Sequence, residues 1–267
     1  MVSLHRLLLA PLLASLLKSI WAETRERASF SDYEDKLEFW AWRYRTNVTN
    51  WHRDQIHPVL KSLGDRVGLP YYVDGESCVS EERNEELRVF VPLCGKTLDL
   101  AYFARHPFVR FVQGVDGVAK ALESFVAEHP DLEIVLDAEE EASWTGTKIG
   151  LWQTNFFDLD PKKGKGSFDI VYDRGALVAI DPTLRLSYLA IIGQLIKPHT
   201  GKILLSVVER QKDFMGGPPF TIPENDVRNL FETQSWVKRV EGPLEGEPDP
   251  GDDPAKWISK YYIVHAK

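Results

Sequence analysis

The chain has 267 residues, of which 43% are hydrophobic and 27% are charged, and its formal net charge at pH 7 is −8. A chain of this length and ordinary composition can bury one large core, so we expect a single globular domain. An excess of negative charge repels nucleic acid and anionic lipid, because phosphate binding needs clustered Lys and Arg. The two cysteines provide neither a disulfide framework nor a metal cluster. The composition therefore argues against a nucleic-acid partner and against a metal cofactor.

The first residues have the pattern of a targeting leader. An apolar run at 7–17 follows a histidine and an arginine, and no acidic residue occurs before Glu23. The run is too short to span a membrane, and Ala22 is suitable as the last residue before cleavage. We expect a hydrophobic leader over residues 1–22 that directs the chain to the secretory pathway or to an organelle. In a secreted chain, Asn47 would be a glycosylation site.

Two helices are predicted in the segment 31–64. Aromatic and apolar residues recur at helical spacing over 37–44 and over 56–63, and the residues between them have the composition of a cap and turn. The polar, acidic stretch 72–86 predicts a loop. We expect these helices to form an N-terminal cap of a single domain that covers residues 23–267.

From residue 88 onward, short apolar runs alternate with helical patterns. Such alternation predicts a parallel sheet with helices on both faces. Only one helix, at 223–231, and a short acidic loop accompany the last two runs, which favours an antiparallel pair at the sheet edge. The seven predicted strands are 88–92, 110–116, 149–154, 167–173, 202–208, 235–240 and 261–265, and the helices between them are 96–105, 118–128 and 182–196.

The stretch RVFVPLCGKTLDLA at 88–101 predicts a strand, a small-residue turn and the start of a helix. Its Gly95-Lys96-Thr97 sequence is similar to the end of an ATP-binding loop. That loop needs a second glycine five residues earlier, where this chain has Phe90. The turn can still present backbone N–H groups to a ligand at a helix N-terminus. We therefore expect a ligand site without a triphosphate cradle.

Residues at the other strand ends complete the candidate site, because ligands of open α/β sheets bind beyond the carboxyl ends of the strands. Asp116 follows the second strand, where a carboxylate either binds both hydroxyls of a ribose or caps the next helix. Asn155 and Phe156 follow the third strand, and an aromatic ring there either flanks an adenine or packs in the core. Arg174 follows the fourth strand, where it either holds an anion or pairs with a neighbouring aspartate. Together these residues predict a nucleoside site.

Five parts of the chain support a more specific interpretation. They are Trp40 with Trp51-His52, RVFVPLCGK at the first strand, GVD at the second, FDIVYDRGALVAI at the fourth, and GPPFTIP at 217–223. In these parts the chain resembles the thiopurine S-methyltransferase family of class I S-adenosylmethionine-dependent enzymes. The resemblance covers most of residues 38–231. Its most specific parts are VPLCGK and DRGALVAI, because ordinary methyltransferases carry several glycines at the first strand.

The resemblance implies a Rossmann-like class I methyltransferase fold, S-adenosylmethionine as methyl donor, no metal, and a small-molecule thiol as acceptor. It also implies a cytoplasmic monomer, which contrasts with the leader. We further expect Arg174 to act in catalysis by favouring the acceptor thiolate. The implied donor-site residues are Trp40, Trp51, Leu93, Gly95, Asp116, Asn155, Phe156 and Arg174, and the implied acceptor-site residues are Trp51, Pro218, Pro219 and Phe220.

One segment departs from the family. Between Val240 and Trp257 the family tends to carry basic residues, whereas this chain reads EGPLEGEPDPGDDPAK. The identity of the acceptor therefore stays open, and an aliphatic dithiol, hydrogen sulfide or a selenium compound is an alternative to a thiopurine. A catalytically silent fold that binds a nucleoside is a further alternative, although such a fold would not need to keep Asp116 and Arg174.

Overall fold

The structure, a computed structural model, describes most of the chain. The described residues are 29–73, 86–211, 216–249, 252–253 and 255–267. They belong to two compact units, which divide between Val48 and Thr49. The predicted leader lies outside the described residues and stays a prediction. Among the described helices, none combines the length and the apolar character that a membrane span requires.

The first unit contains helix α2 (Lys36–Arg45) and a cluster of aromatic side chains. The rings of Phe39 and Trp40 meet edge to face with centroids 5.1 Å apart, and Phe39 is buried. Asn47 is exposed in the turn after α2. The two helices predicted over 31–64 are both present, but only α2 belongs to this unit.

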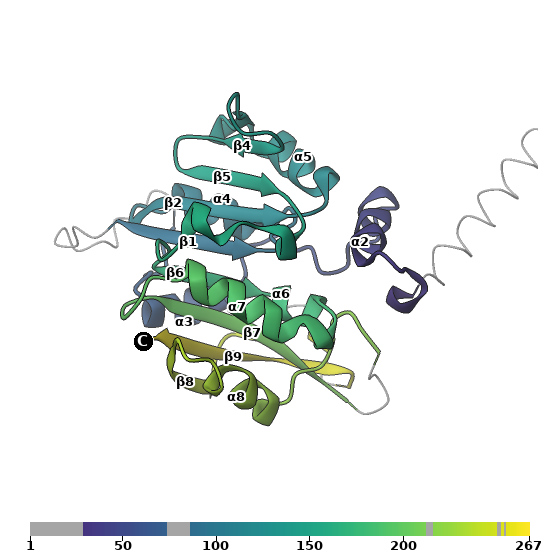
Figure 1. The fold of residues 1–267 in the computed structure, drawn as a ribbon, viewed down its shortest axis with the longest axis vertical. Coiled ribbons are helices and arrows are strands. Elements are labelled where there is room, and N and C mark those ends of the chain that lie inside the picture. Colours follow the sequence, from purple (N-terminus) through teal and green to yellow (C-terminus); the bar gives the residue numbers. More distant parts are fainter. Residues whose placement is uncertain (1–28, 74–85, 212–215, 250–251, 254) are drawn as a thin grey trace, which may run out of the picture. The chain divides into compact units, whose positions relative to one another are not determined.

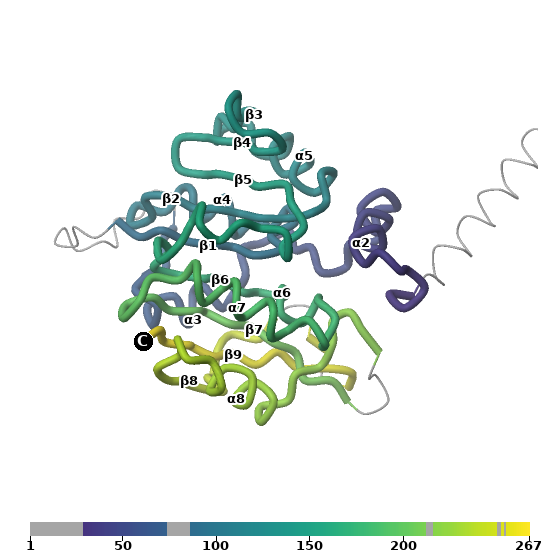
Figure 2. Tube along the Cα trace, viewed as in Figure 1, coloured from purple at the N-terminus to yellow at the C-terminus, as the bar shows by residue number. Residues whose placement is uncertain are grey.

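A nine-stranded sheet forms the centre of the second unit (Figure 1). Its strand order is β3-β4-β5-β2-β1-β6-β7-β9-β8, in which β5, β2, β1, β6 and β7 are parallel. Strand β9 lies between β7 and β8 and is antiparallel to both (Figure 2). The strands are β1 (Leu87–Pro92), β2 (Val109–Asp116), β3 (Val135–Leu136), β4 (Ser143–Thr145), β5 (Ile149–Gln153), β6 (Ile170–Arg174), β7 (Lys202–Arg210), β8 (Val237–Leu244) and β9 (Trp257–Ala266).

Seven of these strands are the predicted ones, and the antiparallel pair lies at the predicted edge. The sheet has nine strands rather than seven because β3 and β4 form an antiparallel hairpin beside β5. These two strands have two and three residues, and runs of that length show neither alternation nor an apolar block.

Helices cover both faces of the sheet. Strand side chains alternate between two apolar clusters, with Val89 and Val91 in one and Phe90 in the other, as the two-residue period of a strand requires. The first cluster includes α3 (Pro58–Leu63), α4 (Leu98–Arg105) and α5 (Ala119–Glu128), and the second includes α6 (Ala176–Ala179), α7 (Arg185–Leu195) and α8 (Glu224–Glu232).

The strand order places the candidate site. The chain leaves β1 for β2 on one side of β1, and β6 lies on its other side, so the order reverses between β1 and β6. Because the five central strands are parallel, their carboxyl ends share one edge of the sheet. Ligands of such sheets bind at that edge, beside the reversal.

Candidate donor and acceptor site

The turn after β1 has an unusual backbone. Leu93 has φ of 45° and Gly95 has φ of 54°. A left-handed conformation is rare for leucine, and backbone strain of this kind is concentrated at ligand sites. The backbone N–H of Cys94 donates to the carbonyl oxygen of Val115 at 2.9 Å and holds the turn against β2. Cys94 is buried, and burial raises the pKa of its thiol well above the usual value, so it serves here as a small apolar residue.

Lys96 and Thr97 directly precede α4, which begins at Leu98 rather than at the predicted residue 96, and Thr97 is the N-cap of this helix. Lys96 Nζ pairs with Glu128 Oε1 of α5 at 2.6 Å. Thr97 Oγ1 accepts the backbone N–H of Asp99 at 3.3 Å, which caps α4. The side chains of Lys96 and Thr97 are thus engaged in an ion pair between helices and in helix capping.

Asp116 lies at the end of β2 and is 8% exposed. Its Oδ2 accepts the N–H of Gly95, and its Oδ1 accepts the N–H of Val118, both at 2.8 Å. The side chain therefore ties the turn after β1 to the segment that leads into α5. Burial raises the pKa of Asp116 to about 6, and the two backbone hydrogen bonds oppose this rise. Since a carboxylate has about four acceptor positions, it retains capacity for two ribose hydroxyls.

The residues after β5 differ in their accessibility. Asn155 is exposed, and its Oδ1 accepts the N–H of Phe157 at 3.1 Å. Phe156 is 1% exposed, and its ring centroid lies 4.8 Å from that of Tyr188. Two roles were considered for the Phe156 ring, which were a contact with adenine and packing in the core. In the structure the ring packs in the core. A donor contact at this position would involve the backbone.

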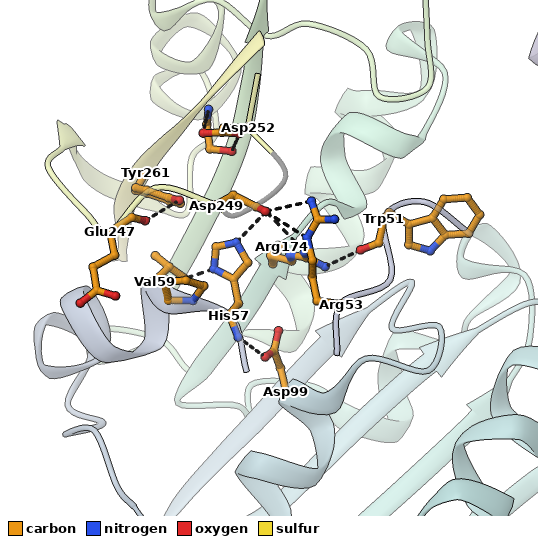
Figure 3. Close-up of polar contacts among 12 residues, drawn as sticks. Trp51, Arg53, His57, Val59, Asp99, Arg174, Glu247, Asp249, Asp252 and Tyr261 are labelled. Carbon is orange, nitrogen blue, oxygen red and sulfur yellow. Dashed lines mark hydrogen bonds and ion pairs between the residues drawn. The ribbon is translucent and has the colours of Figure 1, made fainter. Parts of the chain in front are cut away.

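Arg174 lies at the end of β6, and its side chain is 13% exposed. Its Nη1 donates to the carbonyl oxygen of Trp51 at 3.2 Å, and its Nη2 pairs with Asp249 Oδ2 at 3.4 Å (Figure 3). The neighbouring aspartates that would serve the structural alternative are Asp169 and Asp173. The observed carboxylate partner is instead Asp249, which belongs to the acidic segment between β8 and β9.

The predicted acceptor loop lies beside α6 and the end of β7. The backbone N–H of Phe220 donates to the carbonyl oxygen of Val178 at 2.7 Å. Arg210 Nη1, at the end of β7, donates to the carbonyl oxygen of Pro219 at 2.9 Å. Pro218, Pro219 and Phe220 are all partly exposed. These hydrogen bonds hold the loop beside α6, which follows β6, and beside the end of β7.

The structure joins some of the predicted site residues directly. The backbone N–H of Gly95 donates a hydrogen bond to Asp116, and the backbone carbonyl oxygen of Trp51 accepts one from Arg174. Trp40 belongs to the first unit, so its part in the donor site stays a prediction. Among the described residues, no group of three or more His, Cys, Asp or Glu side chains is arranged to hold a metal.

Sequence reasoning missed three residues of the site. Arg53, His57 and Asp249 form a polar cluster with Arg174 (Figure 3). No local motif marks them, because 196 residues separate Arg53 from Asp249. The only available signal was the excess of acidic residues between Val240 and Trp257.

Asp173 supports the end of β6 from the core. Its Oδ1 accepts the N–H groups of Ala176 and Leu177, at 3.0 and 3.1 Å, and its Oδ2 accepts the hydroxyl of Tyr188 at 2.7 Å. Burial raises the pKa of Asp173 to about 6, although these hydrogen bonds oppose the rise. This carboxyl therefore binds its proton more tightly in the folded protein than in the unfolded chain.

We predict that Asp173→Asn reduces the pH dependence of stability. The stability contributed by a carboxyl with a raised pKa is present below about pH 4 and is lost as the pH rises to about 6. Asparagine keeps the acceptor for the α6 N–H groups and can donate to Tyr188. Between pH 4 and pH 7 the free energy of unfolding of the parent should fall by up to about 3 kcal/mol more than that of the variant. Urea unfolding at both pH values measures this, and equal changes for both proteins would contradict it.

Comparison with known proteins identifies the family. The family model for thiopurine S-methyltransferase matches residues 35–257. The chain belongs to the thiopurine S-methyltransferase family. A thiopurine S-methyltransferase of Vibrio cholerae is 34% identical over 196 residues, which cover 73% of this chain and 80% of that protein. The Bos taurus enzyme of the same name is 33% identical over 212 residues, or 77% and 79% of the two chains.

A solved structure similar to this chain is a Burkholderia thailandensis 1,6-didemethyltoxoflavin-N1-methyltransferase with S-adenosylhomocysteine bound. It is 21% identical, covers 68% of this chain and 72% of its own, and has a TM-score of 0.47. The predicted resemblance to the thiopurine S-methyltransferase family is thus confirmed by the family match. The protein is an S-adenosylmethionine-dependent methyltransferase, and its sheet has the predicted α/β architecture.

Proposed function

We propose that this protein moves a methyl group from S-adenosylmethionine to the thiol sulfur of a small molecule. The observation that carries the proposal is the buried carboxylate of Asp116, bonded to the strained turn after β1. That arrangement offers acceptor atoms for a ribose beside the backbone of Leu93 and Gly95. The family match supports a thiol as the acceptor.

The residues at this edge of the sheet suit the donor. Asp116 retains acceptor positions for ribose hydroxyls, and the guanidinium of Arg174 suits a carboxylate or a thiolate. We propose that the donor is held by Trp40, Trp51, Leu93, Gly95, Asp116, Asn155, Phe156 and Arg174. We propose that the acceptor is enclosed by Trp51, Pro218, Pro219 and Phe220.

The reaction requires the protein to position the donor and the acceptor and to place a positive charge near the acceptor sulfur. It does not require a strong general base. When bound, S-adenosylmethionine supplies an electrophilic methyl group on a positively charged sulfur. The acceptor thiol would lose its proton to solvent, and its sulfur would bond to the methyl carbon as the bond between that carbon and the donor sulfur breaks. The products would be a thioether and S-adenosylhomocysteine. The positive charge of Arg174 favours the thiolate, and Phe220 of the loop and Trp51 keep water away from it. Holding the reacting atoms in line contributes roughly 7–11 kcal/mol in favourable cases.

A binding measurement followed by a turnover assay tests the proposal. Calorimetry with S-adenosylhomocysteine first establishes whether the donor site binds its ligand. Transfer of a labelled methyl group is then measured with 6-mercaptopurine and with aliphatic thiols. We expect a thioether product with at least one of these acceptors. Binding of the nucleoside without transfer to any thiol would instead support the catalytically silent fold.

A further inference from the structure

One carboxylate is shared by three basic side chains at the end of β6. Asp249 Oδ1 accepts from Arg53 Nε at 3.0 Å and pairs with Arg53 Nη2 at 2.9 Å. Its Oδ2 contacts His57 Nε2 at 2.9 Å and Arg174 Nη2 at 3.4 Å (Figure 3). The side chain of Asp249 is 11% exposed, so these contacts are made largely out of water. We call these four residues the Asp249 cluster.

The histidine of the cluster needs no positive charge to take part. His57 Nδ1 accepts the backbone N–H of Val59 at 3.1 Å at the start of α3. The ring proton is therefore on Nε2, which donates to Asp249. The backbone N–H of His57 donates to the buried carboxylate of Asp99 at 2.9 Å, which holds the main chain at this residue.

Several contacts hold the Asp249 segment in place. The backbone N–H of Glu247 donates to Ser62 Oγ of α3 at 3.1 Å, and its carbonyl oxygen accepts from the Tyr261 hydroxyl at 3.1 Å. Beyond Asp249, Asp252 accepts both the N–H and the hydroxyl of Ser259 at the start of β9. The carboxylate is thus presented to the arginines by a segment that is bonded to α3 and β9.

The Asp249 cluster lies on the acceptor side of the site. This assignment rests on the proposed function. Strand β1 separates β2 from β6, so Asp116 and Arg174 lie on opposite sides of β1. With the ribose held by Asp116, the remainder of the reaction site extends toward Arg174. The acceptor loop is on this side as well, because Phe220 is bonded to Val178 of α6, which directly follows β6.

An anionic ligand would bind to the N–H groups of the two arginines. Several of these N–H groups are already bonded to Asp249 or to nearby backbone carbonyl oxygens. Arg53 directs two nitrogens to Asp249, and its Nη1 donates to the carbonyl oxygen of Asn50 at 3.2 Å. Arg174 divides its two terminal nitrogens between Trp51 and Asp249. The two arginines and Asp249 together keep a net charge of +1, which can still favour the thiolate sulfur. A further negative charge on the acceptor would meet the Asp249 carboxylate or have to displace it. Displacement leaves a poorly solvated carboxylate without its partners, which is costly.

We propose that Asp249 is an internal counter-ion that closes the arginine pair to anionic acceptors, so that the enzyme selects thiols without a negative charge near the sulfur. The acidic segment between β8 and β9 then has a definite function. The segment supplies the carboxylate of Asp249 to the two arginines in place of a negatively charged group of the acceptor. A neutral or cationic thiol can approach without competing for the arginines.

The test uses two unreactive ligands that differ in charge. Dissociation constants of 4-(methylthio)benzoate and 4-(methylthio)benzamide are measured on the full chain saturated with S-adenosylhomocysteine. The parent should bind the amide more tightly than the acid. In Asp249→Asn the affinity for the acid relative to the amide should rise by at least about tenfold. Methylation rates of 4-mercaptobenzoate and 4-mercaptobenzamide should change in the same direction.

Two further variants serve as controls. Glu245→Gln removes the same charge from an exposed position of the same segment, and it should keep the ratio of the parent. Asp249→Glu keeps the charge at the cluster and should keep the preference for the amide. If Asp249→Asn does not fold, the parent and Asp249→Glu still test the proposal. Tighter binding of the acid than of the amide by both proteins would overturn it.

Other outcomes also separate the possibilities. An unchanged ratio in folded Asp249→Asn would show that the carboxylate serves only the fold. Tighter S-adenosylhomocysteine binding with equal changes for both ligands would mean that Asp249 competes with the donor, and the proposal would be wrong. Failure of the parent to methylate any thiol would count against the proposed function. It would leave the binding ratios as an independent test of the counter-ion.

Discussion

Asp116→Ala is expected to weaken binding of S-adenosylmethionine by roughly 10- to 150-fold, because removal of a charged hydrogen-bond acceptor costs about 1.5–3 kcal/mol. The variant loses the proposed ribose contacts and also the bond that holds Gly95 N–H. Calorimetry with S-adenosylhomocysteine measures the effect, and thermal unfolding shows whether the fold survives. Asp173→Asn is a control for donor binding. Asp173 lies on β6, which β1 separates from the β2 strand of Asp116, and its carboxyl has the same raised pKa of about 6. Unaltered donor binding by folded Asp116→Ala would restrict Asp116 to its structural bonds.

The pH dependence of donor binding gives a second measure of Asp116. Ribose hydroxyls donate to the ionised carboxylate, so binding favours the form without the proton. With a pKa of about 6 in the free protein, affinity should be constant above that pH. Below it, affinity should fall by up to about tenfold per pH unit. The fall should be absent in Asp116→Ala, and its persistence there would assign the titration to another group.

Arg174→Lys is expected to lower kcat/KM by roughly 10- to 100-fold, although it conserves the positive charge. The guanidinium contacts Trp51 and Asp249 through two nitrogens in a fixed fork. A lysine ammonium is a single point and cannot reproduce both contacts. If Arg174 favours the acceptor thiolate, the pH–rate profile should shift to higher pH while the donor dissociation constant changes little.

The alternative for Arg174 is a donor contact, and the same variant distinguishes it. Loss of a contact with the donor carboxylate would raise the donor dissociation constant and leave the profile at its original pH. Arg53→Lys is the matched control, because Arg53 binds the same Asp249 carboxylate from a different element. It should shift the profile less than Arg174→Lys. An unshifted profile in Arg174→Lys would exclude the thiolate role.

The framework of the fold was predictable because its signals are local. Buried parallel strands are short apolar runs, and the predicted sheet strands agree with β1, β2 and β5 to β9. Strand ends also located Asp116 and Arg174, since a parallel sheet brings its carboxyl ends to one edge. The hairpin of β3 and β4 was missed because its strands are too short to show a pattern.

The detailed contacts of the site were not predictable in the same way. Arg174 and Asp249 are 75 residues apart, and nothing in the sequence states that the acidic segment reaches β6. Phe156 illustrates a different difficulty. Its type and position suit a ligand contact and a core contact equally, and the burial of its ring beside Tyr188, with centroids 4.8 Å apart, became visible only in the structure.

The position of Asp249 between two antiparallel edge strands has a consequence for how such an enzyme can change. The parallel strands that carry Asp116 and Arg174 pair with β1, β5 and β7, and no residue of that edge connection takes part in their pairing. Substitutions there can alter which molecules are methylated while Asp116 and the turn after β1, which would hold the donor, stay unchanged. Mutational variation in this one connection is therefore a short route to new acceptors, and exchanging it between relatives would be a direct way to transfer a preference.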